Sequence, residues 1–240
     1  MANTDNSSLE RYSIITEKNP REITLLRGNG CKWLKCRFCN YHLDRCPDEE
    51  QNFILNKEVL DRVSGIYAKL EVINSGSFVD LDTKTMNYII TKCKEKNISE
   101  IHFECHYMHK DSVEDLRRLF DTNGIKAKIK IGVETFDSLF REAYLVKGID
   151  TDSPEEIAKY FDEVCLLQGI PGQTSESMIN DIETGLKYFE RVCVNIMVDN
   201  GMPIRPDPRV IKNFIENVYP LYINNNRVDI LLNNTDFGVG

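Results

Sequence analysis

The chain has 240 residues, 38 of them acidic and 30 basic, so its formal net charge at pH 7 is −8. This length suffices for one large α/β domain, and the acidic balance argues against a nucleic-acid partner, since binding a phosphate backbone needs clustered basic side chains. The polar N-terminus lacks a signal-peptide core and no apolar run is long enough to cross a bilayer, so we expect a cytoplasmic protein without a membrane partner.

Short β-branched or apolar runs alternate with amphipathic helical patterns along the chain. The predicted strands are 22–28, 69–76, 99–105, 126–134, 162–170 and 191–199. The predicted helices between them are 56–68, 82–97, 111–124, 137–148 and 175–190. This alternation predicts a parallel sheet, because parallel neighbours need a crossover connection. Six such units are expected to form either a doubly wound layer or an incomplete barrel.

Polar and glycine-rich segments follow the predicted strands. In both candidate architectures a ligand binds at the C-terminal strand ends. The segments that fall there are the cysteine-rich loop and residues 74–78, 104–109, 132–135, 168–174 and 198–206. The sequence therefore predicts one binding site for a small molecule at this edge of the sheet.

Three of the eight cysteines, Cys31, Cys36 and Cys39, lie within nine residues and follow the spacing C-x4-C-x2-C. In a cytosolic chain such thiols are better interpreted as ligands than as disulfide partners. A cubane iron–sulfur cluster takes four cysteine ligands, so three would leave one iron open for catalysis. The alternative is a structural zinc site, with Cys46 or His42 as the fourth ligand.

The three-cysteine loop after the first strand, with Phe38 before the third cysteine, resembles that of the radical S-adenosylmethionine (SAM) superfamily. The commonest spacing there has three residues between the first two cysteines, whereas this chain has four. The resemblance implies a partial (β/α)6 TIM-like barrel, with a [4Fe-4S] cluster held by Cys31, Cys36 and Cys39. It also implies SAM as a second cofactor and an electron donor of the flavodoxin or ferredoxin type.

The resemblance further implies which segments hold SAM. NSGSF after the second strand matches the glycine-rich segment at the methionine amino group, the glutamate ending KIKIGVE matches a ribose ligand, and LLQGIPGQT matches the segment that passes the adenine. The implied cofactor-binding residues are Asn74, Ser75, Gly76, Ser77, Glu134, Gln168 and Gly169. An ordinary turn at Gly76 and a surface carboxylate at Glu134 are the alternatives.

NSGSFVD and IGVETFD resemble segments of small radical SAM enzymes that act on 7-deazaguanine nucleosides. These enzymes include one that forms archaeosine in tRNA and one that releases queuine from queuosine 5′-phosphate. The compact, acidic chain suits the second activity, so the resemblance implies a nucleotide substrate. Modification of another 7-deazaguanine nucleoside or of tRNA is the alternative.

Such a substrate needs a carboxylate or amide at the base edge and a cation at the phosphate. The guanidinium of an arginine mounted between two prolines can pair two phosphate oxygens. We expect one domain over 1–240, with a core of about 20–200 and with 201–240 helping to close the substrate site. The candidate substrate residues are Glu104, His106, Arg205, Asn233 and Asp236. A structural histidine at 106 and a simple turn at the C-terminus are the alternatives.

Overall fold

The computed structural model describes residues 9–232, and its centre is one eight-stranded sheet in the order β1 to β8. Strand β1 pairs antiparallel with β2, and all later neighbours are parallel. The strands are β1 Tyr12–Ile15, β2 Arg21–Leu26, β3 Lys69–Asn74, β4 Glu100–Glu104, β5 Lys126–Glu134, β6 Glu163–Gln168, β7 Arg191–Ile196 and β8 Val228–Leu231.

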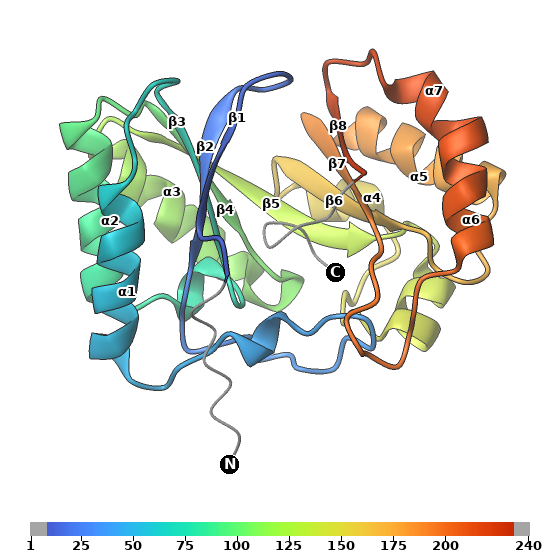
Figure 1. Ribbon diagram of the computed structural model, residues 1–240, viewed down its shortest axis with the longest axis horizontal. Coiled ribbons are helices and arrows are strands. Elements are labelled where there is room, and N and C mark those ends of the chain that lie inside the picture. Colours follow the sequence, from blue (N-terminus) through green and yellow to red (C-terminus); the bar gives the residue numbers. More distant parts are fainter. Residues whose placement is uncertain (1–8, 233–240) are drawn as a thin grey trace.

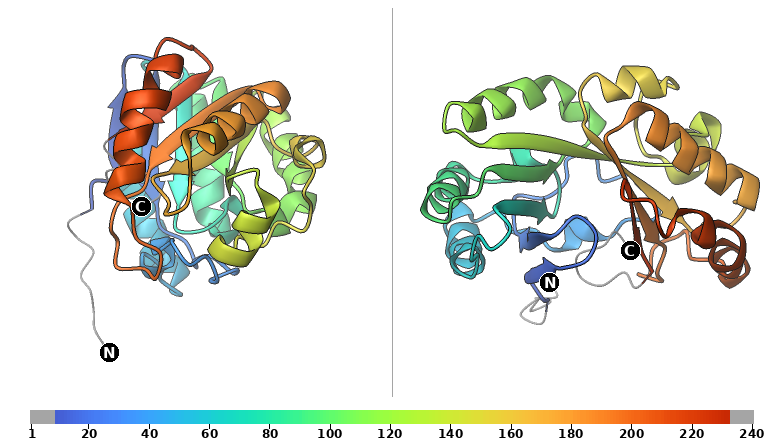
Figure 2. Two further views of the ribbon diagram at one scale, coloured as in Figure 1. Left: turned by 90° about the vertical axis from the view of Figure 1, so that its right-hand side faces the viewer. Right: turned by 90° about the horizontal axis from the view of Figure 1, so that it is seen from above.

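Helices join successive strands and cover the outer face of the curled sheet (Figures 1 and 2). The α-helices are α1 Glu49–Asp61, α2 Thr83–Glu95, α3 Val113–Asp121, α4 Pro154–Ala158, α5 Ser175–Tyr188, α6 Pro208–Asn213 and α7 Tyr219–Tyr222. Short 3-10 segments are η1 Tyr41–Leu43, η2 Phe78–Asp80 and η3 Tyr107–Ser112, and π-helical turns are η4 Phe140–Leu145 and η5 Phe214–Val218. The predicted partial α/β barrel is confirmed.

The barrel is incomplete because β1 and β8 are the two ends of the sheet and do not pair with each other. Figure 2 shows them on opposite sides of the open face. Lys18, in the turn after β1, spans this gap: its Nζ donates to the carbonyl oxygens of Asn225 and Val228, each at 3.1 Å. One side chain thus tethers the two ends of the sheet.

The two faces of the sheet carry different chemistry because successive side chains of a strand point to opposite sides. Outward residues such as Leu70, Val72 and Phe103 pack in the main hydrophobic core with helix residues such as Leu116 and Ile182. Full burial of each such side chain contributes about 1.5–3 kcal/mol. This core fixes the helices outside and leaves the inner face for polar groups.

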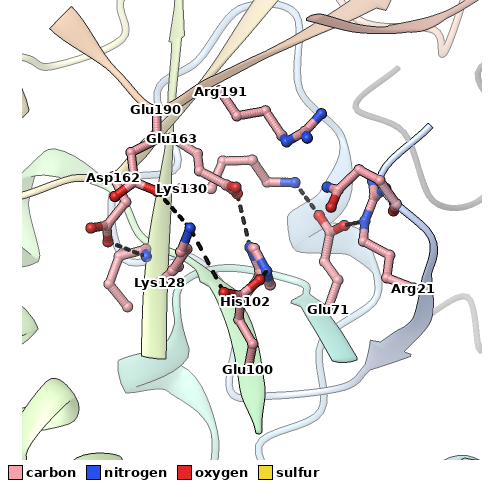
Figure 3. Close-up of polar contacts among 12 residues, drawn as sticks. Arg21, Glu71, Glu100, His102, Lys128, Lys130, Asp162, Glu163, Glu190 and Arg191 are labelled. Atoms are coloured by element: carbon pink, nitrogen blue, oxygen red, sulfur yellow. Dashed lines mark hydrogen bonds and ion pairs between the residues drawn. The ribbon is translucent and has the colours of Figure 1, made fainter. Parts of the chain in front are cut away.

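Charged side chains fill the inner face near the N-terminal strand ends (Figure 3). Glu71 lies between two cations and forms ion pairs with Arg21 and Lys130, and all three side chains are buried. Burial alone would raise the pKa of Glu71, but the two cations lower it far below its ordinary value. This end of the barrel is therefore closed by paired charges.

His102 extends this network along β4. Its Nδ1 lies 3.0 Å from Glu163 Oε2 and its Nε2 lies 3.0 Å from Glu100 Oε1. Burial alone would lower the pKa of His102, but hydrogen bonds to these two carboxylates raise it. Since carboxylates accept hydrogen bonds, both ring nitrogens donate, and the imidazolium form fits this position.

Several boundaries differ from the sequence prediction. The first helix is not 56–68: it begins at Glu49, where the Asp48 side chain accepts from the N–H groups of Glu50 and Gln51. Strands β1 and β8 and the helical segment 208–222 were not predicted, so the six expected strands become eight. All six predicted strands, which are β2 to β7, are confirmed within a few residues. So are the predicted helices at 82–97, 111–124 and 175–190.

The predicted helix 137–148 is confirmed only in part. The chain is helical over 138–145, mostly as the π-helical turn η4, which ends where Val146 adopts a left-handed conformation with φ 57°. The segment beyond it therefore turns back toward the strand ends, which brings 146–148 to the site. Within residues 9–232, no helix combines the length and apolar character needed to span a bilayer.

Candidate active site

The C-terminal ends of the strands surround an open cavity, at the edge of the sheet where parallel α/β folds bind their ligands. The predicted site residues that line this cavity are Cys31, Cys36, Cys39, Ser75, Gly76, Ser77, Glu104, His106 and Glu134. Lining residues that were not predicted are Phe38, Tyr41, Cys105, Gly132, Lys147 and Cys165. The structure thus brings the loop cysteines together with the ends of β3, β4, β5 and β6.

Hydrogen bonds fasten the cysteine loop to segments that follow later strands. Trp33 Nε1 donates to the carbonyl oxygen of Val146 at 2.8 Å. The Arg37 N–H donates to the carbonyl oxygen of Leu145 at 3.0 Å, and the Arg37 carbonyl accepts from the N–H of Ile204 at 3.1 Å. The cysteines are therefore presented by a loop whose backbone is held from two sides.

The three cysteines are free thiols on one wall of the cavity. Burial raises the pKa of Cys36 to about 12 and that of Cys39 to about 11. Cysteine binds metals as the thiolate, so iron would have to displace protons from these buried sulfurs. Three thiolates facing an open cavity fit a cluster that keeps one iron accessible.

The fourth ligand of the zinc alternative is not present at this wall. Neither Cys46 nor His42 lines the cavity, and Cys46 Sγ lies 3.9 Å from Gln51 Oε1 instead. Across residues 9–232, no three His, Cys, Asp or Glu side chains, the three loop cysteines included, are grouped as ligands of a single metal ion. The missing fourth ligand at this wall is therefore the observation that argues against a closed tetrahedral zinc site.

Glu134 and Lys147 form a buried ion pair at the mouth of β5. Lys147 Nζ donates to Glu134 Oε1 at 2.6 Å. Burial alone would lower the pKa of Lys147, but the carboxylate raises it well above its ordinary value. Glu134 is 1% exposed with φ 70°, and its Oε2 has no hydrogen-bond partner. A buried acceptor left unpaired at a cavity fits a ligand hydroxyl such as that of a ribose.

Sequence reasoning missed Lys147 because the segment around it was assigned to a helix. The lysine reaches Glu134 only because η4 ends early at Val146. No local pattern distinguishes it from a surface lysine, so only the tertiary structure reveals it.

The turn after β3 brings its backbone close to the cysteine loop. The N–H of Cys31 donates to the carbonyl oxygen of Ser75 at 3.2 Å. Asn74 supports the turn from below: its Nδ2 donates to the Ser77 carbonyl at 2.9 Å, and its buried Oδ1 has no partner. Gly76 leaves the turn open because a Cβ there would lie 2.9 Å from Cys31 N and would also meet the Asp80 carboxylate.

Replacing Gly76 by alanine is therefore expected to displace the cysteine loop. The added methyl group would push on backbone atoms of Cys31, which cannot rotate away as a side-chain end can. We expect iron retained after anaerobic reconstitution to fall at least severalfold, with little change in circular dichroism. Gly124→Ala is the control for backbone strain without a steric contact, since φ there is 74° but a Cβ meets nothing within 4 Å. Equal iron content in the two variants would contradict the proposed close approach.

Glu104 lies at the end of β4, on the cavity wall, above the charged network. Burial raises its pKa, and the nearby Lys130, whose Nζ is 3.7 Å from Oε1, opposes that rise. Cys165 and Tyr41 also line the cavity. The floor of the cavity thus offers a carboxylate, a phenol and a thiol to a ligand.

His106 lines the cavity, but both of its ring nitrogens are used within the protein. Nε2 donates to the carbonyl oxygen of Lys147 at 2.7 Å, so Nδ1 is unprotonated and accepts from the N–H of Met108 at 3.2 Å. Burial and the Lys147 charge lower the pKa of His106 to about 4. The ring stacks on Trp33 with centroids 5.6 Å apart. Its carbon atoms, rather than its nitrogens, are left to contact a ligand.

The other predicted site residues that the structure describes do not line the cavity. Gln168 is fully buried with no hydrogen-bond partner for its side-chain amide, and Gly169 has φ 97°. Arg205 is exposed and pairs with Asp199 at 3.1 Å. Asn233 and Asp236 lie outside the described residues.

An incomplete parallel barrel with three free thiols on the loop after its first parallel strand has the architecture of a radical SAM enzyme. No family model and no curated protein sequence matches the chain. Among solved structures, it is similar to a queuine lyase from Clostridium spiroforme bound to SAM and queuine, with 43% sequence identity and a TM-score of 0.90. The match covers 97% of this chain and 100% of that one. This chain therefore belongs to the queuine lyase family of radical SAM enzymes.

Proposed function

We propose that this chain is a radical SAM lyase that releases queuine from queuosine 5′-phosphate. The supporting observation is the full-length similarity to a lyase that binds SAM and queuine, at 43% identity. The cavity at the strand ends, with its three thiols, offers a place for the same chemistry. Eight free cysteines accord with the reducing cytoplasm that the sequence predicts.

We assign the cluster to Cys31, Cys36 and Cys39 and the cofactor to the neighbouring strand ends. When bound there, the cluster and SAM would together supply radical chemistry for hydrogen abstraction from the substrate ribose. The chain's own contribution is positioning: the turn at Ser75 and Gly76 lets the methionine end approach the cysteine loop. Glu134, held by Lys147, offers Oε2 to the cofactor ribose.

Glu104 is our candidate for recognition of the base. The guanine-like edge of a 7-deazaguanine presents two neighbouring N–H donors, and an ionised carboxylate accepts both. Burial raises the pKa of Glu104, and Lys130, whose Nζ lies 3.7 Å from Oε1, opposes that rise and so favours the ionised form. Arg205 remains the predicted contact for the phosphate, Asn233 and Asp236 remain predicted substrate contacts, and Gln168 and Gly169 remain predicted contacts for the adenine.

The direct test is the reaction itself. Protein purified and reconstituted without oxygen should carry about four irons per chain. Incubated with dithionite, SAM and queuosine 5′-phosphate, it should yield free queuine and 5′-deoxyadenosine, measured by mass spectrometry. Formation of 5′-deoxyadenosine without queuine would reject the lyase activity while leaving the radical SAM assignment intact.

Replacing Cys36 by alanine is expected to abolish both the cluster and queuine release. Loss of one of three thiolates leaves too few ligands to hold the cubane. Cys46→Ala is the matched control, because Cys46 lies on the same segment but outside the cavity. It should keep its iron and full activity. A Cys46→Ala protein that loses metal would instead support the zinc alternative.

A further inference from the structure

The cysteine loop differs in charge from the rest of the chain. Residues 27–45 contain five basic residues and one acidic residue, a formal charge of +4, whereas the whole chain carries −8. The one carboxylate, Asp44, already receives two hydrogen bonds from the Arg11 guanidinium, at 2.7 and 2.9 Å. A cationic surface thus lies on an otherwise anionic protein.

Three cations of this loop, Lys32, Lys35 and Arg37, are exposed to solvent. Within residues 9–232, none of the three forms an ion pair. Two of them nevertheless have defined positions. Lys35 Nζ lies 4.6 Å from the centre of the Trp33 ring, and Arg37 Nη1 donates to the carbonyl oxygen of Tyr144 at 3.3 Å. Oriented cations that form no ion pair within the described residues are available to an anionic surface.

An exposed leucine lies among these cations in a strained conformation. Leu34 has φ 56°, in the left-handed region, and is 49% exposed. Such a conformation is strained in a residue other than glycine. Leu43, 63% exposed, adds a second apolar side chain on the same segment. Apolar groups surrounded by charges are the usual composition of a transient protein interface.

The sequence places this surface next to the cluster ligands. Lys32 directly follows Cys31, and Lys35 and Arg37 flank Cys36. The thiols line the inner cavity while the three cations are exposed. A protein bound outside would therefore be separated from the cluster by little more than the thickness of one loop.

We propose that Lys32, Leu34, Lys35, Arg37 and Leu43 form the docking surface for an acidic one-electron carrier of the flavodoxin type. This rests on the proposed function, which requires an electron for each cleavage of SAM. In the docked complex the reduced carrier loses one electron and the cluster gains it, with no bond made between the proteins. The opposite charges of the two surfaces accelerate encounter and set the orientation.

Charge reversal tests this surface. The variant Lys32→Glu/Lys35→Glu is compared with Lys94→Glu/Lys126→Glu, which makes the same change in net charge. Lys94, in the last turn of α2, and Lys126, the first residue of β5, are exposed at the other end of the strands. The Kd for a bacterial flavodoxin, titrated by calorimetry at low salt, should rise at least about tenfold in the loop variant and about twofold or less in the control.

Activity separates docking from chemistry. With dithionite as the reductant, both variants should release queuine at the wild-type rate, whereas with reduced flavodoxin only the loop variant should be slow. Equal Kd values for the two variants would contradict the proposed docking surface. So would an equal loss of queuine release by the loop variant with both reductants. Failure of the proposed function has a different signature, because wild-type protein would then release no queuine even with dithionite while the Kd measurements stand.

Leu34→Gly tests the apolar part of the surface without disturbing the fold. Glycine adopts φ 56° without strain, so the Tm should not fall. The Kd for flavodoxin should nevertheless rise severalfold, because the side chain at the centre of the contact is lost. An unchanged Kd would contradict a role for Leu34 in docking.

Discussion

Replacement of Glu71 by leucine is expected to lower the free energy of unfolding by about 3–5 kcal/mol, as removal of one partner from a buried ion pair does. Glu71 is the only carboxylate that forms an ion pair with both Arg21 and Lys130 among the described residues, and both cations are buried. Leucine matches much of its volume but leaves two buried positive charges without this partner (Figure 3). Urea unfolding followed by circular dichroism measures the change.

The control for this substitution is Glu95→Leu, since Glu95 is half exposed and its pair with Lys92 contributes about 1 kcal/mol at most. The triple variant Arg21→Met/Glu71→Leu/Lys130→Met should regain part of the loss, because both cations are removed together with the carboxylate that they share; recovery is incomplete because Glu104 loses its pair with Lys130. A Glu71→Leu protein as stable as Glu95→Leu would show that the network does not support the fold.

The ion pairs of Glu71 also make the stability of the protein depend on pH. Because Arg21 and Lys130 lower the pKa of Glu71, its stabilising contribution is present above the ordinary carboxylate value of about 4.5. This contribution is lost as the pH falls through the lowered pKa that Glu71 has in the folded state. Wild-type stability should therefore decline more steeply below pH 4.5 than that of the Glu71→Leu variant.

Long apolar strands and amphipathic helices were predictable, whereas short or polar elements were not. Strands β1 and β8 have four residues each, too few to show a period. Helix α1 begins earlier than predicted, and the one buried residue of 49–55 is Asn52, a polar residue. The Asn52 amide donates to the Cys46 carbonyl at 2.8 Å and accepts from Arg27 Nε at 2.9 Å. Periodicity cannot detect a buried face made of asparagine.

At the site, residues that act through local spacing were predictable and residues that depend on distant contacts were not. The three cysteines are close in sequence, so their spacing alone predicted a shared ligand. Lys147 meets Glu134 only through the turn that ends η4. Both ring nitrogens of His106 form hydrogen bonds with backbone groups, one of which is 41 residues away in the sequence. Such pairings follow from tertiary packing, which one sequence does not display.

Replacement of Lys147 by methionine is expected to lower kcat/KM by about 100-fold, equivalent to about 2.7 kcal/mol. Methionine keeps the length of the side chain but removes the cation that holds the buried Glu134 carboxylate. The Kd for SAM, titrated on the reconstituted protein, should rise with it, since Glu134 is the proposed ribose ligand. Lys126→Met, at an exposed lysine at the far end of β5, is the control and should retain activity.

A double-mutant cycle decides whether the pair acts as a unit. Glu134→Gln alone removes the ribose acceptor and leaves Lys147 unpaired, whereas Glu134→Gln/Lys147→Met leaves no buried charge unpaired. If the lysine acts by holding the carboxylate, the double variant should be little worse than either single one. Multiplicative losses would show that Lys147 contacts the cofactor or substrate independently. Iron content measured beside each rate excludes loss of the cluster as the cause, because both residues lie in the same cavity as Cys36 and Cys39.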